Sequence, residues 1–213
     1  GASSGMGFEV AKLLLSAGWQ LGIAARREDR LLTLQTLAPQ RVSMECLDVT
    51  LPDAPTRLLS LIDRNGGMDL FFYASGIGHQ NRPLDSAVEM DTVRTNALGF
   101  TQMVDLAFNY FAAHGGGHLA AISSIAGTKG LGAAPSYSAT KAFQNIYLQS
   151  LDQLAAMRKL NISITDIRPG FVDTDLLNDG HRYPLLMNKK TVARAIVSAI
   201  RHRRHIVVID LRW

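Results

Sequence analysis

The chain has 213 residues, of which 47% are hydrophobic and 19% charged, and it carries a formal net charge of +4 at pH 7. These values are typical of one globular domain spanning residues 1–213, and the absence of any run of 18 apolar residues argues against a membrane-spanning helix. The single cysteine, Cys46, excludes an internal disulfide and favours a cytoplasmic location, and its apolar neighbours predict a buried thiol.

Hydrophobic patterning predicts strands that alternate with helices along the whole chain. The expected helices cover residues 5–17, 28–37, 53–65, 91–113, 136–158 and 189–202. The expected strands cover residues 20–25, 42–47, 70–74, 117–123, 163–168 and 206–209. Because these strands are apolar without alternation, both faces of the sheet should be covered, which predicts an α/β protein with a doubly wound parallel sheet, the Rossmann fold.

The chain opens on a glycine-rich turn, Gly1-Ala2-Ser3-Ser4-Gly5-Met6-Gly7, directly ahead of the first expected helix. Glycines let a backbone approach a pyrophosphate, and the helix N-terminus offers free N–H groups. In the doubly wound order, a strand in the middle of the sheet precedes such a turn. We therefore expect a first strand, missing before Gly1, of about six to ten apolar residues. Intact mass showing a mature protein that starts at Gly1 would contradict this.

Tyr137 and Lys141 stand four residues apart in the expected helix at 136–158, so they share one helix face. An ammonium beside a phenol favours the phenolate, which makes the tyrosine a usable proton donor and acceptor near neutral pH. Such a pair suits the reduction of a carbonyl or the oxidation of an alcohol. Chance alone can supply one pair at this spacing, so its weight depends on the motifs around it.

Four motifs in order carry a resemblance to the short-chain dehydrogenase/reductase family, in its compact single-domain branch: the turn at 1–7, Asp48, Ser124 and the pair Tyr137–Lys141. The resemblance covers nearly the whole chain. It implies that Ser124 hydrogen-bonds the substrate carbonyl and that Tyr137 donates the proton. It further implies that Lys141 lowers the tyrosine pKa and holds the nicotinamide ribose, and that Asn96 positions a water that relays protons to the lysine. Ser123 is expected to be structural.

The resemblance also implies NADP(H) as cofactor, because the strand expected at 20–25 is followed by Arg26 and Arg27 rather than by an acid. Arg26 would bind the 2′-phosphate, helped by Ser3 and Arg27; the alternative is a surface arginine pair ahead of a helix. The other implied cofactor residues are Gly1, Ser4, Gly5, Met6, Gly7, Asp48, Val49, Gly76, Tyr137, Lys141, Pro169, Gly170, Val172 and Thr174. The family's Asn-Asn-Ala-Gly is here Tyr73-Ala74-Ser75-Gly76, so only the glycine is kept. No metal is expected.

The implied substrate is a small carbonyl or alcohol compound, bound between the variable segments 79–83, 128–135 and 176–186. Two other functions stay open: a non-catalytic NADP(H) sensor or scaffold, and a nucleotide-sugar epimerase or dehydratase of the extended branch. Little chain follows Asp175, which disfavours the extended branch.

The expected partner is a second copy of the chain, in a homodimer or homotetramer, with Leu148, Leu151 and Leu154 as candidate contacts unless they belong to the core. No nucleic-acid partner is expected, and a membrane partner is disfavoured. The basic cluster at 201–205 is therefore interpreted as a solvated helix end.

Overall fold

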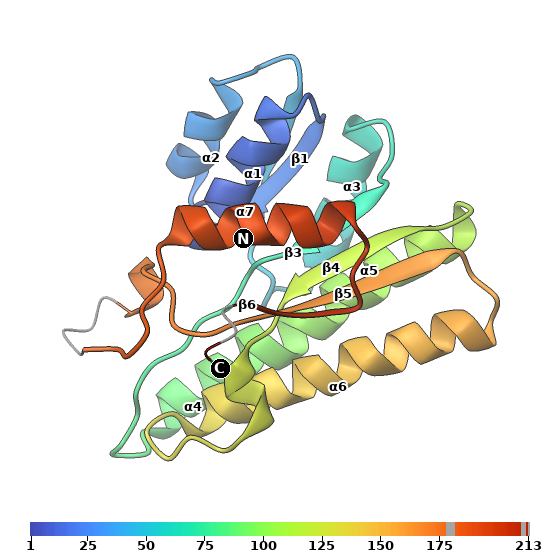
Figure 1. The fold of residues 1–213 in the computed structure, drawn as a ribbon. Helices are drawn as coiled ribbons and strands as arrows, with labels where there is room; N and C mark the ends of the chain where they lie inside the picture. The colour runs from blue at the N-terminus through green and yellow to red at the C-terminus, as the bar shows by residue number, and fades with distance from the viewer. Residues whose placement is uncertain (178–181, 210–211, 213) are drawn as a thin grey trace.

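The computed structural model describes residues 1–177, 182–209 and 212 and confirms the alternation of strands and helices (Figure 1). The strands are β1 (Leu21–Ala25), β2 (Val42–Cys46), β3 (Leu70–Tyr73), β4 (Gly117–Ile122), β5 (Ile162–Pro169) and β6 (Ile206–Ile209). The helices are α1 (Gly5–Ser16), α2 (Glu28–Gln35), α3 (Ala54–Arg64), α4 (Ser86–Val93), α5 (Gly99–Ala113), α6 (Pro135–Met157) and α7 (Lys189–Arg201). Each predicted strand is therefore found close to its predicted bounds.

Every strand pair is parallel, and helices cover both faces, as the doubly wound fold requires. In β4, Leu119 and Ala121 pack with α5 and α6, whereas Ala120 and Ile122 pack with α1 and α7. Successive side chains of a strand point to opposite faces, so the uniformly apolar β4 serves two cores at once. Figure 1 shows the two layers, with α1 and α7 above the strands and α5 and α6 below them.

The helix expected at 91–113 is longer and less regular than the sequence predicted. It begins at Ser86, because the Asp85 carboxylate accepts a hydrogen bond of 2.8 Å from the Ala87 N–H and caps the helix. A π-helical turn, Arg94–Leu98, then separates α4 from α5. Such turns often occur at functional sites, and this one carries Asn96.

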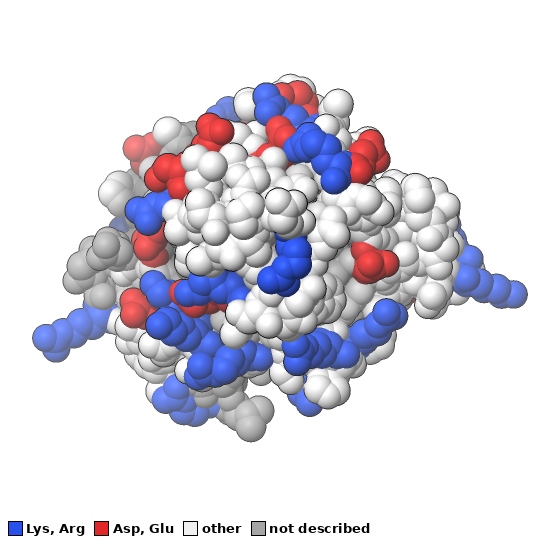
Figure 2. Space-filling model, turned by 90° about the horizontal axis from the view of Figure 1, so that it is seen from above, with Lys and Arg blue, Asp and Glu red and all other residues white. Residues whose placement is uncertain are grey.

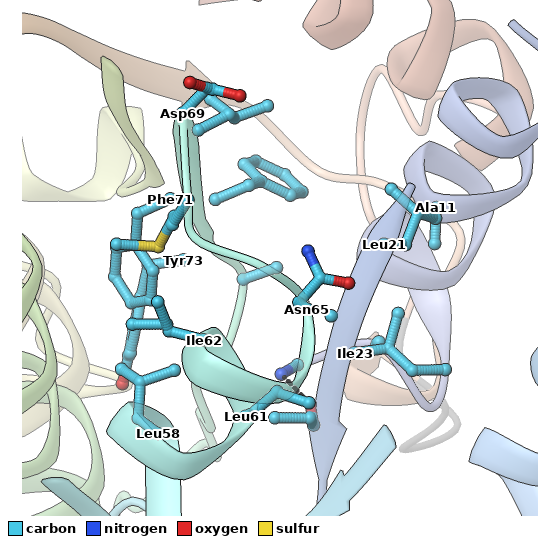
Figure 3. Close-up of a pocket in the computed structure, with 18 of the residues that line it drawn as sticks. Ala11, Leu21, Ile23, Leu58, Leu61, Ile62, Asn65, Asp69, Phe71 and Tyr73 are labelled. Carbon is cyan, nitrogen blue, oxygen red and sulfur yellow. Dashed lines mark hydrogen bonds between the residues drawn. The ribbon is translucent and has the colours of Figure 1, made fainter. Parts of the chain in front are cut away.

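The strands do not form one continuous sheet. β1 pairs with β2, and β3, β4, β5 and β6 form a second sheet in that order. A cavity of about 630 Å³ lies between β1 and β3, and apolar side chains from both strands and from α1 and α3 line most of it (Figure 3). Its labelled lining includes Ala11, Leu21, Ile23, Leu58, Leu61, Ile62, Phe71 and Tyr73.

The cavity lies where the doubly wound order would place a strand between β1 and β3. Within the described residues, the facing edges of β1 and β3 have no strand partner. The strand expected ahead of Gly1 stays a prediction. Most of the residues that line the space between β1 and β3 are apolar.

The exposure of Cys46, of the leucines in α6 and of the basic cluster at 201–205 agrees only in part with the expectations from the sequence. Cys46 was predicted to be buried but is exposed, because it is the last residue of β2, where its Sγ donates to the Arg26 carbonyl at 3.3 Å. Leu148 and Leu151 lie in the core, so of the three candidate dimer contacts only Leu154 reaches the surface. The basic cluster at 201–205 is exposed where α7 ends, as interpreted from the sequence.

Charge is spread unevenly over the face seen from above. Figure 2 shows Lys and Arg predominating in the lower half of the view, whereas acidic and basic side chains are interspersed in the upper half. Among the described residues, no helix combines the length and the apolar character that crossing a membrane requires.

Candidate active site

The carboxyl ends of β3, β4 and β5 bring the predicted catalytic residues together. Ser123 and Ser124 follow β4, Gly170 follows β5, and the loop containing Gly76 follows β3. The first turns of α6 carry Tyr137 and Lys141 against this edge. In open parallel sheets this edge is where ligands bind.

Ser124 is buried and caps a short 3-10 turn, Ile125–Thr128, with its Oγ accepting from the Ala126 N–H at 3.0 Å. The hydroxyl also donates to the Pro169 carbonyl at 3.4 Å. These contacts join the ends of β4 and β5 and fix the hydroxyl next to Tyr137. Gly127 in the same turn lies so close to α6 that a Cβ there would stand 2.5 Å from the Lys141 carbonyl carbon.

The Tyr137 ring packs on Gly78, where a Cβ would lie 2.5 Å from Tyr137 Cδ2. Lys141 is buried, and its Nζ lies 5.8 Å from the centroid of the Tyr137 ring. Nζ donates to the Ile122 carbonyl at 3.1 Å and to Gln144 Oε1 at 2.9 Å. The ammonium is thus held beside the phenol by two neutral acceptors.

Burial is the largest influence on the pKa values of Tyr137 and Lys141. Burial raises the pKa of the Tyr137 phenol, and the neighbouring Ser124 side chain only partly opposes this. Burial lowers the pKa of Lys141 to about 8, against the pull of the Asp166 charge. The lowering of the tyrosine pKa by Lys141 stays a prediction, since the hydrogen bonds of the ammonium go to Ile122 and Gln144.

Asn96 is fully buried and ties three segments of the site together. Its Oδ1 accepts from the Ile77 N–H at 2.9 Å, and its Nδ2 donates to the Ile77 carbonyl at 2.7 Å and to Thr140 Oγ1 at 3.3 Å. Its own carbonyl accepts from Gln144 Nε2 at 2.7 Å. Asn96 and Lys141 are consequently joined through Gln144.

Sequence reasoning missed Gln144, which is completely buried and bridges the lysine and the π-helical turn. The available signal was its position three residues after Lys141, on the same helix face. Tyr73, which replaces the first asparagine of the family motif, lies in the core with its ring edge-on to Phe100 at 5.3 Å.

The glycine turn fits a phosphate-bearing cofactor. Gly5 has a φ of +55°, a conformation that favours glycine, and a Cβ on Gly7 would stand 2.2 Å from the Gly1 carbonyl oxygen. Ser4 precedes α1 with extended backbone, and its side chain does not cap the helix. The first N–H groups of α1, including that of Met6, are those that bind anions at helix N-termini.

Arg27 lies against the glycine turn. Its Nε and one terminal nitrogen donate to Ser3 Oγ at 3.3 and 3.2 Å, and its other terminal nitrogen lies 3.9 Å from Asp175 Oδ2. The Arg26 side chain is exposed and makes no hydrogen bond or ion pair within the described part of the chain. Both arginines border the turn, with Arg27 already engaged and Arg26 free.

The remaining implied cofactor residues lie at the same edge. Asp48 Oδ1 accepts from the N–H and hydroxyl of Thr50 at 2.9 and 2.8 Å, which makes it a turn-stabilising group. Val49 belongs to the core and packs on Gly99. Thr174 lies over the glycine turn, with its Cγ2 3.3 Å from a Cβ placed on Gly5, and Val172 is buried.

The substrate segments are only partly described, since residues 178–181, including His181, lie outside the described residues. Gln80 Nε2 donates to Tyr183 Oη at 3.3 Å, so the segments at 79–83 and 176–186 meet. The Tyr183 ring also packs on Phe171 at 4.8 Å.

A family model described as short chain dehydrogenase matches residues 1–182. The chain belongs to the short-chain dehydrogenase family. An uncharacterized oxidoreductase of Mycobacterium tuberculosis is 31% identical over 210 residues, covering 94% of this chain and 82% of that protein. One of Myxococcus xanthus is 33% identical over 184 residues, covering 83% and 71%. A short-chain dehydrogenase from Sphingobium yanoikuyae, solved with NADPH, matches with a TM-score of 0.88 at 20% identity, covering 100% of this chain and 87% of that one.

This short-chain dehydrogenase is accordingly an oxidoreductase of a family that uses a nicotinamide cofactor. The likeness to the solved structure supports the fold.

Proposed function

We propose that the protein is an NADP(H)-dependent carbonyl reductase, transferring a hydride between the nicotinamide and a carbonyl or alcohol substrate, with Tyr137 as general acid and base. The observation that carries the proposal is the connected arrangement of Ser124, Tyr137 and Lys141 with Asn96 at one edge of the sheet. The complete set argues against a non-catalytic binding protein, which need not keep all four residues.

The nicotinamide, when bound, supplies the hydride. In the reductive direction, the Ser124 hydroxyl donates to the substrate oxygen and offsets its developing negative charge. The Tyr137 hydroxyl donates its proton to the same oxygen. The Lys141 ammonium, held by Ile122 and Gln144, stabilises the phenolate that this step leaves.

In this scheme, burial of the Tyr137 phenol controls when its proton is released. A tyrosine with a raised pKa keeps its proton until the substrate oxygen becomes basic. Lys141, with a pKa of about 8, is mostly charged at neutral pH and can release a proton at slightly alkaline pH. Asn96 and Gln144 form the polar path that leads from it into the protein.

NADP(H) is proposed over NAD(H) because the two residues directly after β1 are arginines, and the first acid after the strand is Glu28. Two proteins of similar fold, the Sphingobium enzyme and an actinorhodin polyketide ketoreductase, were solved with NADPH. In this scheme Arg26 binds the 2′-phosphate. Arg27, hydrogen-bonded to Ser3, lines the side of the phosphate site next to the glycine turn.

We also propose a cytoplasmic homodimer or homotetramer acting on a small-molecule substrate. The outer side of α6 exposes Phe143, Ile146, Leu154 and Met157, of which Met157 is 80% exposed. Light scattering of the purified protein tests this assembly, and a monomer at micromolar concentration would contradict it.

The function is tested by NADPH oxidation with aldehydes, ketones, diketones, quinones and acyl-carrier ketoesters. Tyr137→Phe should lower turnover by about 10²–10⁴-fold and leave NADPH binding nearly unchanged. Tyr110→Phe is the control, because Tyr110 stacks on His114, away from the site. Retained turnover in Tyr137→Phe would rule out the assigned acid. NADPH binding without turnover of any compound by the unmodified protein would favour the sensor function.

A further inference from the structure

A buried carboxylate stands behind the catalytic serine and lysine, and the scheme above gives it no role. Asp166, in β5, is 3% exposed. Its Oδ1 accepts a hydrogen bond from Ser123 Oγ, and its Oδ2 accepts from Nε and a terminal nitrogen of Arg168, each at 2.7 Å. Asp166 and Arg168 are two residues apart on one strand, so they share a face.

Its hydrogen-bond partner Ser123 lies between two groups of the catalytic centre. On one side of Ser123, the Ile122 carbonyl accepts from Lys141 Nζ at 3.1 Å. On the other side is Ser124. The N–H of Ser123 also donates to the Ile167 carbonyl at 2.9 Å, which joins this strand end to β5. A change at Asp166 therefore reaches both Lys141 and Ser124 through one residue.

Charge links Asp166 to the same lysine. The charged groups that act on the Asp166 carboxylate are Arg168 on its own strand and Lys141 from α6. Burial raises the pKa of Asp166, and Ser123, Arg168 and Lys141 oppose this. For Lys141 the direct ligands are two neutral oxygens, so Asp166 is the anion that favours its charged form.

We propose that Asp166 is a positioning residue of the catalytic centre, which fixes the Ser123–Ser124 strand end and acts as the buried counter-charge that keeps Lys141 protonated. The use of Lys141 in catalysis rests on the proposed function, but the ionisation of Lys141 can be measured without a substrate. The competing role for Asp166 is that of a partner for Arg168 alone, with no effect on the lysine.

The test is the titration of Lys141 in Asp166→Asn, a variant that keeps the shape and removes the charge. The chain has six lysines, so lysine-labelled protein followed by NMR can resolve them, with Lys141→Arg giving the assignment. The midpoint of Lys141 should fall by about 0.5–1 pH unit. The matched control is Glu45→Gln. Glu45 lies on β2, and its carboxylate is paired with Arg57 and Arg64 of α3, so its removal should leave the midpoint of Lys141 unchanged.

Asp166→Asn leaves Arg168 without its partner, and the loss of a buried charge partner can prevent folding. The double variant Asp166→Asn with Arg168→Met removes both charges and should show a smaller downward shift, because loss of the Arg168 cation partly offsets loss of the anion. Asp166→Glu should restore the midpoint. A folded variant without the Asp166 charge but with an unchanged Lys141 midpoint would overturn the proposal. Should the midpoint fall while NADPH affinity keeps its pH dependence, the counter-charge role stands and the ribose-binding role of Lys141 fails.

Discussion

Neutralising Arg26 is predicted to separate the two cofactors. Arg27 is already held by Ser3 and lies near Asp175, whereas the side chain of Arg26 makes no hydrogen bond or ion pair among the described residues. Arg26 can therefore turn to a 2′-phosphate without breaking an existing contact. Arg26→Gln removes the charge and keeps much of the side chain, and Arg26→Asp adds repulsion of the phosphate.

The expected size follows from the chemistry of the contact. A hydrogen bond to a charged group contributes about 1.5–3 kcal/mol, which corresponds to about 10–100-fold in affinity. Arg26 is exposed, so solvent screening favours the lower end of this range. We expect NADPH affinity to fall about tenfold in Arg26→Gln and further in Arg26→Asp. NADH affinity should change less than about threefold, because NADH lacks the 2′-phosphate.

Dissociation constants for NADPH and NADH can be measured by calorimetry at low and high salt. Arg30→Gln is the matched control, because Arg30 lies in α2 beside Asp29 and away from the glycine turn. The NADPH loss in Arg26→Gln should shrink at high salt. An equal loss for both cofactors would refute the assigned role, as would an unchanged NADPH affinity.

Two further predictions concern the site and the core. Gly78→Ala places a methyl group 2.5 Å from Tyr137 Cδ2, so kcat should fall about 10–100-fold through displacement of the ring; Gly130→Ala, which meets open space, is the control, and equal kcat in both variants would contradict this. Burial, together with the charge of Arg203, lowers the pKa of His118 to about 4. Because the unfolded imidazole, with its ordinary pKa near 6.5, binds the proton first, stability should be lost as pH falls from 6.5 to 4, by up to about 3 kcal/mol. Urea unfolding should show a smaller loss of stability between pH 6.5 and pH 4 in His118→Gln than in the unmodified protein. The loss in His202→Gln should equal that of the unmodified protein. Equal losses in the unmodified protein and both variants would contradict the assignment.

Much of this architecture could be predicted because the strands are short apolar runs between helical segments, and the structure confirms the six of them. The errors arise where a local contact overrides the pattern. The helix expected from residue 91 begins at Ser86, because Asp85 caps it. Cys46 follows an apolar run yet is exposed, since it ends its strand. For Leu148 and Leu151 the sequence leaves both a dimer contact and the core open, and the structure places them in the core because α6 turns that side to the sheet.

In the site, residue types were easier to predict than their electrostatics. The sequence could indicate that Tyr137 and Lys141 share a helix face, but the pKa of each depends on burial and on residues far away in the chain. Gln144 and Asp166 become relevant only when α6 and β5 are brought against the same strand end. No spacing rule along the chain connects residue 166 to residue 123.

The two sheets carry different groups of the proposed site. The four-stranded sheet carries the groups proposed for proton transfer, since Ser124 follows β4 and Asn96 binds the loop after β3. The two-stranded sheet carries the groups proposed for the adenosine half, Arg26 after β1 and Asp48 after β2.

Gly1 stands between these halves. Its amine donates to the Ala24 carbonyl at 2.8 Å, and a Cβ on it would lie 2.4 Å from the Ala74 carbonyl carbon. The glycine turn therefore spans the two sheets at the edge where the cofactor is proposed to lie, while the cavity separates β1 from β3 behind it. A cofactor bound along this edge would contact the carboxyl ends of both β1 and β3, so the glycine turn, which lies between them, is placed to contact its pyrophosphate.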